Sequence, residues 1–258
     1  MARRLVKHRM LAISLLAVLV ALGLWGVASR SFNPQLLPGP DRVLTGALEL
    51  AASGRLLDSI LISLQRVFKG WLLGTAIAIP LGLLAGTSAL ARAALDPFIH
   101  FFRFVPALAL TSLFMLWFGI GEGSKVNLVA YAVAFVVLVV TASGASSINR
   151  DKLLGATSLG ANRWELFWRV VLPATFPAIF VGMRLALASA FLVIVAAEAI
   201  AAQEGIGFLI WNARTFFRTD FMFVGILCFG ILGFASDRIW MLIGRTFLSR
   251  YLTGLGSY

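Results

Sequence analysis

Few residues in this sequence have the types and spacing that catalysis or metal binding would need. Cys228 is the only cysteine, and the two histidines, His8 and His100, lie far apart in the chain, so the sequence offers no metal-ligand spacing. The stretch nearest to a P-loop, GIGEGSK at 119–125, has the wrong residue order. GxSxG and HExxH motifs do not occur. We therefore expect no catalytic residue, no metal, no cofactor and no ATP binding of the P-loop kind.

The composition is typical of a membrane protein. Of the 258 residues, 60% are hydrophobic and 13% are charged, and the mean hydropathy is +0.94, whereas a soluble domain is about half apolar and about a quarter charged. Several apolar runs reach the roughly 20 residues that a helix needs to cross the hydrocarbon core. Because these runs are continuous rather than alternating, the sequence predicts an all-α integral membrane fold and not a barrel.

The apolar runs predict about six transmembrane helices in a single transmembrane domain over residues 10–258. The expected spans lie near 10–28, 62–86, 98–118, 126–146, 177–202 and 221–244. The first run is longer than the core of a secretory signal and lacks a clean cleavage site, so we interpret it as an uncleaved span. The prolines of 34–40 and the mixed segment 41–58 predict an extended external stretch followed by a short interfacial helix.

The basic residues predict the orientation in the membrane. The net charge is +11, but no basic block interleaved with aromatic residues occurs, so we expect no nucleic-acid partner. Lysine and arginine gather on the cytoplasmic side of membrane proteins. The basic segment 1–9, the final Arg245 and Arg250, and the basic connection 147–176 therefore predict that both termini and this connection are cytoplasmic.

Two charged residues are expected within the fifth span. A carboxylate at the centre of a span costs about 2.5–3.5 kcal/mol on insertion scales, so Glu198, near the outer end, is expected to face protein or water. It either shapes an external gate or hydrogen bonds to a neighbouring loop or helix, and the sequence leaves both open. Arg184, deeper in the same span, is the candidate to contact an anion, unless it only sits near the cytoplasmic headgroups.

Small residues recur every four positions on two of the expected spans. Gly70, Gly74, Ala78, Gly82 and Gly86 line one face of the second span, and the fifth span repeats the pattern. Side chains this small let a neighbouring helix approach closely, so both faces are predicted to be packing seams.

The segment from Asp151 to Pro173 is too polar to span a membrane. A helix here would place Ala156 and Gly160, which are four residues apart, on one small-residue face. Larger apolar side chains flank that face: Leu159, Trp164 and Phe167. An exposed apolar patch on a cytoplasmic loop usually marks the docking site of a partner. The alternative is an amphipathic helix that lies on the membrane of its own protein.

The spacing in this segment resembles the EAA-x3-G-x9-I-x-L-P loop of ABC importer permeases. The matching residues are Ala156, Gly160, Val170, Leu172 and Pro173. The chain also reads LLPGP at 36–40, ALDPF at 94–98, LWFGIG at 116–121 and FRTDF at 217–221. These stretches look like the nitrate, sulfonate, taurine and bicarbonate branch of those permeases, and the similarity covers residues 36 to 245.

The resemblance implies a type I ABC importer permease fold with a cytoplasmic coupling helix, in a bacterial inner membrane. Its implied partners are two cytoplasmic P-loop ATPase subunits, an external substrate-binding protein, a second permease copy and membrane lipid. Such a subunit is not an enzyme, because the partner chain hydrolyses ATP. The residues implied to couple to the ATPase are Leu154, Gly155, Ala156, Leu159, Gly160, Ala161, Trp164 and Phe167.

The loop also departs from the family pattern. Leu154 stands where the family has glutamate, and Gly155 where it has the first alanine, so one polar contact to the ATPase is expected to be absent.

The leading hypothesis is therefore an ATP-driven importer subunit for a small anion such as an aliphatic sulfonate or taurine. Nitrate, bicarbonate and a thiamine-precursor pyrimidine remain alternative substrates. A stand-alone channel or secondary carrier would leave the loop motif unexplained and usually shows inverted repeats, which we do not find. A membrane enzyme lacks a catalytic cluster.

Overall fold

Every regular element in the described part of the chain is a helix, which confirms the predicted fold class. The computed structural model describes residues 2–33 and 35–247, so Arg250 lies outside the described residues. The helices are α1 (Ala2–Ser31), α2 (Pro40–Ala52), α3 (Arg55–Thr87), α4 (Ala89–Phe102), the 3-10 helix η1 (Ala107–Leu110), α5 (Thr111–Phe118), α6 (Glu122–Ser146), α7 (Arg150–Ser158), α8 (Arg163–Leu166), the π-helix η2 (Phe167–Val171), α9 (Leu172–Ala201), α10 (Ile206–Thr215) and α11 (Thr219–Phe247). Within these described ranges, five helical segments are long and apolar enough to cross a membrane, or six if one bent pair counts as a span.

Three long helices form the core of the bundle, with α6 packed against both α3 and α9. The glycines of α3 face α6: a Cβ at Gly70 would lie 2.6 Å from the Cβ of Val129. A Cβ at Gly182 of α9 would lie 3.1 Å from the Cβ of Val140 on α6. The predicted packing seams are therefore confirmed, and both meet on α6.

Gly74→Val is expected to destabilise the bundle by about 1–3 kcal/mol. A Cβ at Gly74 would collide with the carbonyl oxygen of Ala130, and a backbone atom in a packed helix cannot move aside as a flexible side chain can. The midpoint of thermal unfolding of the purified protein in detergent should fall. Gly23→Val on α1 is the matched control, since a Cβ there meets nothing within 4 Å. Equal midpoints for the two variants would contradict the seam.

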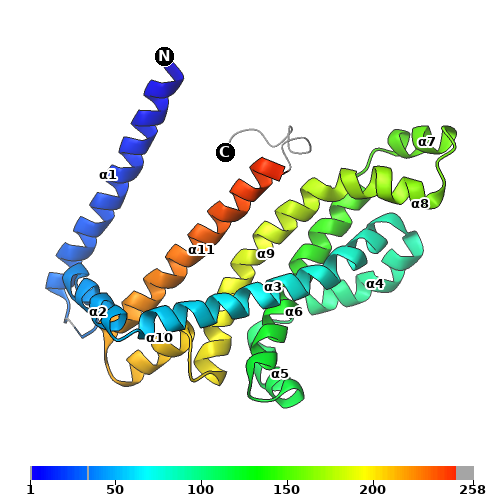
Figure 1. Cartoon of the computed structure of the whole chain (residues 1–258). Helices are drawn as coiled ribbons and strands as arrows, with labels where there is room; N and C mark the ends of the chain where they lie inside the picture. The colour runs from blue at the N-terminus through cyan, green and yellow to red at the C-terminus, as the bar shows by residue number, and fades with distance from the viewer. Residues whose placement is uncertain (1, 34, 248–258) are drawn as a thin grey trace.

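The long helices run between two ends of the molecule. Figure 1 shows the start of α1, the end of α11 and the α7–α8 pair at one end, with α2, α5 and α10 at the other. We call these the inner end and the outer end. Because the start of α1 and the end of α11 lie at the same end, the arrangement agrees with an even number of crossings.

The third expected span, 98–118, is broken rather than straight. The polypeptide forms α4 up to Phe102, turns, and resumes as η1 and α5, and the two parts are bent by 87°. Pro106 precedes η1 and has no N–H, and it disfavours the helical conformation of the residue before it. Apolar character continues across this break, so hydropathy alone could not locate it.

The fifth expected span, 177–202, begins earlier than predicted. Helix runs without a gap from Arg163 through the π-turn Phe167–Val171 into α9, so much of the connection expected at 147–176 is part of one long helical rod. The second span also starts early, at Arg55. Polar side chains at both starts lowered the apolar signal, although they did not stop the helix.

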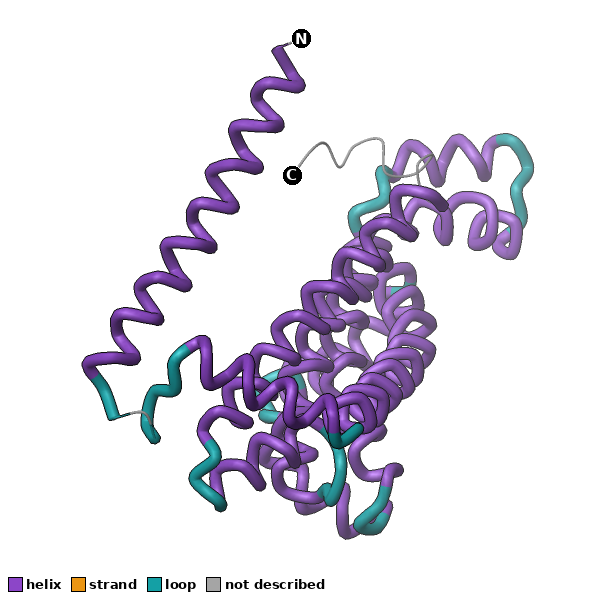
Figure 2. The backbone as a smooth tube through the Cα atoms, turned by 60° about the vertical axis from the view of Figure 1, so that its left-hand side comes forward, coloured by secondary structure: helices purple, strands orange, loops and turns teal. Residues whose placement is uncertain are grey.

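Helix α1 stands apart from the rest of the bundle (Figure 2). Over its apolar stretch from Ala12 to Ser31 no part is buried inside the chain. Its contacts with the bundle come near its C-terminal end, where Trp25 stacks on Phe223 of α11 with ring centroids 5.7 Å apart. The Trp25 Nε1–H also donates to the carbonyl oxygen of Pro38 at 3.1 Å.

Candidate functional site

Glu198 is fully buried near the C-terminal end of α9, where it completes the start of α10. The first N–H groups of a helix have no partner within that helix. The Gly207 N–H donates to Glu198 Oε2 at 2.9 Å, and the Ile206 N–H donates to Ser63 Oγ at 2.8 Å. Ser63 of α3 in turn donates to the Glu198 carboxylate at 2.8 Å. A carboxylate at this helix end is also favoured by the helix dipole.

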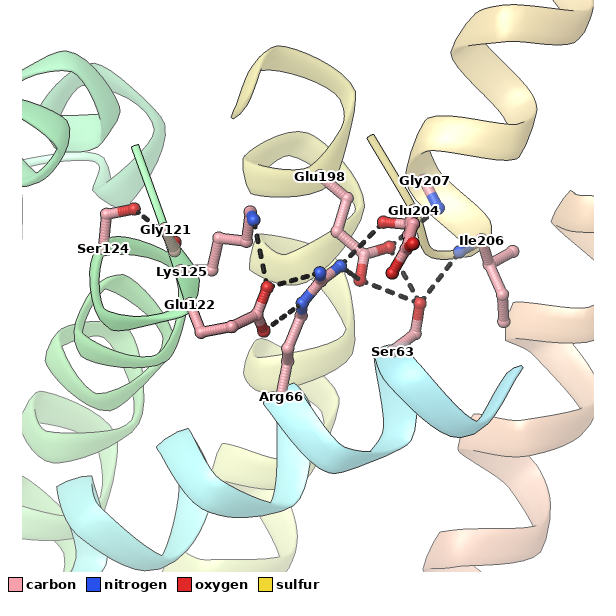
Figure 3. A network of polar contacts seen from close by, with 10 residues as sticks. All are labelled: Ser63, Arg66, Gly121, Glu122, Ser124, Lys125, Glu198, Glu204, Ile206 and Gly207. Carbon is pink, nitrogen blue, oxygen red and sulfur yellow. Dashed lines mark hydrogen bonds and ion pairs between the residues drawn. The ribbon is translucent and has the colours of Figure 1, made fainter. Parts of the chain in front are cut away.

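Arg66 of α3 connects this carboxylate to α6 (Figure 3). Its Nη1 donates to Glu198 Oε1 at 2.8 Å and to the carbonyl oxygen of Glu204 at 2.7 Å. Its Nε and Nη2 donate to the two carboxylate oxygens of Glu122 at 2.7 and 2.6 Å. Lys125 Nζ also approaches Glu122, at 3.3 Å. We call these residues the outer network: Ser63, Arg66, Glu122, Lys125 and Glu198.

The outer network joins α3, α6, α9 and α10 at one point. Its formal charges balance, and the Arg66 side chain is 3% exposed whereas that of Glu122 is 60% exposed. Gly205, with φ of +111°, lets the α9–α10 turn close over Glu198, because a Cβ there would lie 2.5 Å from the carboxylate carbon. The structure thus supports the hydrogen-bonding interpretation of Glu198, and the network holds the outer end together.

The FRTDF stretch forms a second junction at the outer end. Arg218 donates to Asp220 Oδ2 at 2.9 Å and to Glu49 Oε2 of α2 at 2.8 Å, and its guanidinium lies 3.7 Å from the ring centroid of Phe221. The Asp220 and Glu49 carboxylates raise the pKa of the Arg218 guanidinium above its ordinary value. This arginine therefore fastens α2 to the start of α11.

Arg184 of α9 forms an ion pair with Asp237 of α11, and both residues lie away from the ends of their helices. Its Nε lies 2.6 Å from Oδ1 and its Nη2 lies 2.9 Å from Oδ2. The two side chains are 40% and 32% exposed, so this chain alone does not enclose the pair. The residue expected to contact an anion thus already holds a carboxylate of its own protein.

At the inner end, Gly160 ends α7 instead of lying on its face. Its φ is +86°, and the Ala161 N–H donates to the Ala156 carbonyl while the Gly160 N–H donates to that of Thr157, which is a Schellman ending. The expectation that Ala156 and Gly160 share one helix face is therefore wrong. Glycine is needed here because other residues rarely adopt this backbone conformation.

Helix α8 begins at a capping box, in which Asn162 Oδ1 accepts from the Glu165 N–H and Glu165 Oε2 accepts from the Asn162 N–H. Helices α7 and α8, the turn between them and η2 present large apolar side chains to the surface. The exposed fractions are 54% for Leu154, 90% for Leu159, 70% for Trp164 and 49% for Trp168. We call these four residues the inner patch. Gly155 and Gly160 have nothing within 4 Å of an added Cβ, so both lie open, whereas Ala156, Ala161 and Phe167 are half-buried.

Sequence reasoning missed most partners of the two charged residues that it singled out. Asp237 carried the same signal as Glu198, an acid within an apolar run, and could have been found. The pairing of Glu198 with Arg66 could not have been found from the sequence, because 132 residues separate the two. Among the described residues, no three His, Cys, Asp or Glu side chains gather into a metal site.

Comparisons with known proteins identify the family of this chain. Residues 78–247 match the family of binding-protein-dependent transport system inner membrane components. The taurine transport system permease of Escherichia coli is 36% identical over 249 residues, covering 94% of this chain and 88% of the relative. An E. coli permease named for aliphatic sulfonates is 38% identical over 226 residues, covering 87% and 86%.

A chain of the MetNI methionine ABC transporter in an inward-facing conformation has the same fold. Its TM-score is 0.62 at 16% identity, and the match covers 73% of this chain and 95% of the other. At this identity the likeness concerns the fold alone. The family match and the relatives of similar length together establish a multi-pass transport subunit. The chain belongs to the binding-protein-dependent transport system inner membrane components, the permeases of ABC importers.

Proposed function

We propose that this chain is the permease subunit of an ATP-driven importer of small organic sulfonates. The similarity to the taurine and aliphatic sulfonate permeases, which extends over nearly their whole lengths, carries the proposal. The subunit works as a homodimer with an external binding protein and two P-loop ATPase subunits, and the ATPase supplies the hydrolysis.

The inner patch supports the docking of the ATPase at α7 and α8. The four residues belong to α7, α8, the turn between them and η2, and Figure 1 shows the α7–α8 pair at the inner end. An apolar surface of this kind at the end of a bundle gains free energy when a partner covers it. The absence of the family's glutamate at Leu154 makes this contact more apolar than the family pattern, so the ATPase groove should be apolar at the matching place.

Uptake into cells that lack their own sulfonate importers tests the substrate. The chain, expressed with its ATPase and binding protein, should accumulate labelled taurine or ethanesulfonate, and accumulation should stop when the ATPase lysine of the P-loop is replaced. Nitrate, bicarbonate and the thiamine-precursor pyrimidine are the other substrates to be offered. Accumulation of one of these without any sulfonate would overturn the sulfonate assignment but not the importer class.

Both termini are proposed to be cytoplasmic, which places the inner end inside the cell. Ser158 at the end of α7 and Thr215 at the end of α10 are exposed residues at opposite ends. In a Cys228→Ser background, Thr215→Cys should react with an impermeant maleimide in intact cells, and Ser158→Cys only after the membrane is opened. Each variant serves as the control of the other, and the reverse pattern would invert the orientation.

A further inference from the structure

A groove between α9 and α11 runs toward the outer end from the Arg184–Asp237 pair. Its volume is about 450 Å³, and Phe191, Leu192, Val195 and Phe229 line it beyond the pair. From Arg184 to Val195 the α9 backbone rises about 16 Å. Gly230 and Gly233 of α11 leave room on the other side. The groove is therefore apolar along its length and charged at one end.

The charged end carries an excess of positive charge. Arg184 uses Nε and Nη2 for Asp237, and its Nη1 makes no hydrogen bond to any residue in the described ranges. Arg238, the next residue on α11, lies over the ring of Phe234 at 4.7 Å and acts electrostatically on Asp237. Arg238 therefore adds positive charge near the pair, and Nη1 of Arg184, which lines the groove, remains available to an additional anion.

We propose that this groove is a transit site for an aliphatic sulfonate, with the sulfonate on Arg184 and the alkyl chain between α9 and α11. This inference rests on the proposed function. The planar guanidinium that now holds two carboxylate oxygens can hold two sulfonate oxygens in the same way. An apolar slot beyond the charge then accepts the chain.

Asp237 acts in this site as a displaceable counter-ion. When no substrate is bound it neutralises Arg184, and when a sulfonate enters the two anions compete for the guanidinium. Binding in a transport pathway must be favourable enough for entrance and weak enough for release. The return of Asp237 to Arg184 provides the release.

Protection of a cysteine in the groove tests the site directly. Leu192 is 74% exposed and lines the groove. Leu192→Cys in a Cys228→Ser background, in the permease–ATPase complex in phosphatidylcholine nanodiscs, should be alkylated. Ethane-, butane- and hexanesulfonate should slow this alkylation increasingly, by about fourfold in affinity for each added methylene. Leu185→Cys, on the same helix but outside the groove and 54% exposed, should remain unprotected.

Control variants and control ligands distinguish a bound sulfonate from other molecules that could occupy the groove. Arg184→Gln should abolish protection, and hexylammonium should give none. Protection that depends on phosphatidylglycerol in the nanodisc and not on sulfonate would make the groove a lipid site and overturn the proposal. A Leu192→Cys that never reacts would mean that a second copy or lipid covers the groove, and this result would also overturn the proposal. Sulfonate uptake by the unmodified importer together with an unprotected cysteine rejects only this site, whereas absent sulfonate uptake rejects the proposed function.

Asp237→Asn tests the counter-ion. Without the competing carboxylate, Arg184 should hold the sulfonate longer, so both the KM for uptake and the maximal rate should fall, each by about tenfold. A residue with only a structural role would lower the amount of permease and leave the KM unchanged, and that result would overturn the exchange.

Gly230→Leu should lower uptake of hexanesulfonate more than that of ethanesulfonate. A Cβ at Gly230 meets nothing within 4 Å, and because Gly230 lines the groove, the added side chain enters it. Equal losses for the two sulfonates would count against the groove.

Discussion

Replacing Glu198 with alanine should cost the folded permease about 3–5 kcal/mol, which is the usual effect of removing one partner of a buried ion pair. The variant leaves the guanidinium of Arg66, whose side chain is 3% exposed, without its buried carboxylate. It also removes the acceptor of the Gly207 N–H and one partner of Ser63. The expected result is a large loss of permease from the membrane and a lower unfolding midpoint for what remains.

Glu122→Ala is the matched control, because Glu122 pairs with the same arginine from the exposed side. Its side chain is 60% exposed, so water can take over part of what Arg66 and the buried Lys125 lose, and this variant should lose less stability and abundance than Glu198→Ala. Membrane abundance and thermal unfolding in detergent measure both variants. If the two behaved alike, burial would not govern the energetics of the outer network.

A double variant separates charge from packing. Arg66→Met with Glu198→Leu removes both buried charges and keeps apolar volume, and such replacements are often neutral or stabilising. We expect it to recover much of the stability that Glu198→Ala loses. Continued loss would indicate that the hydrogen bonds to α10, which Leu cannot replace, matter more than the unpaired charge.

Leu159→Asp should uncouple the permease from its ATPase while leaving the bundle folded. Leu159 is 90% exposed and caps the end of α7, so a charge there costs this chain little. In the complex it would be buried against an apolar groove without a partner, and central interface residues contribute about 2 kcal/mol or more, about 30-fold in affinity. Co-purification of the ATPase and ATP-driven uptake should both fall strongly.

Ile120→Asp is the matched control for this variant. Ile120 is 80% exposed and precedes α6 at the outer end, so the same chemical change there should leave the ATPase bound. Gly160 is less suitable for such a test, because any side chain at φ of +86° strains the backbone. If Leu159→Asp kept the ATPase but lost membrane association of the α7–α8 pair, α7 would lie on the membrane instead.

Local features of the chain could be predicted well. The approximate number of apolar helices, the short helix before the second span and the glycine seams depend on composition and on helical spacing, which are properties of neighbouring residues. The broken third span and the early start of α9 were missed. In both places the apolar run and the helix have different boundaries. The helix breaks between Phe102 and Ala107 inside an apolar run, and the helix that contains α9 begins before its apolar run does.

The sequence by itself determined that this protein crosses a membrane as helices, which faces of α3 and α9 pack closely, and which family the chain resembles. The tertiary structure alone decided the partners of its buried charges. Glu198 meets Ser63 across 135 residues of chain, and Arg184 meets Asp237 across 53. In an apolar medium each charge must find a partner, but helix packing selects which one, and that selection depends on how helices far apart in the chain are brought side by side.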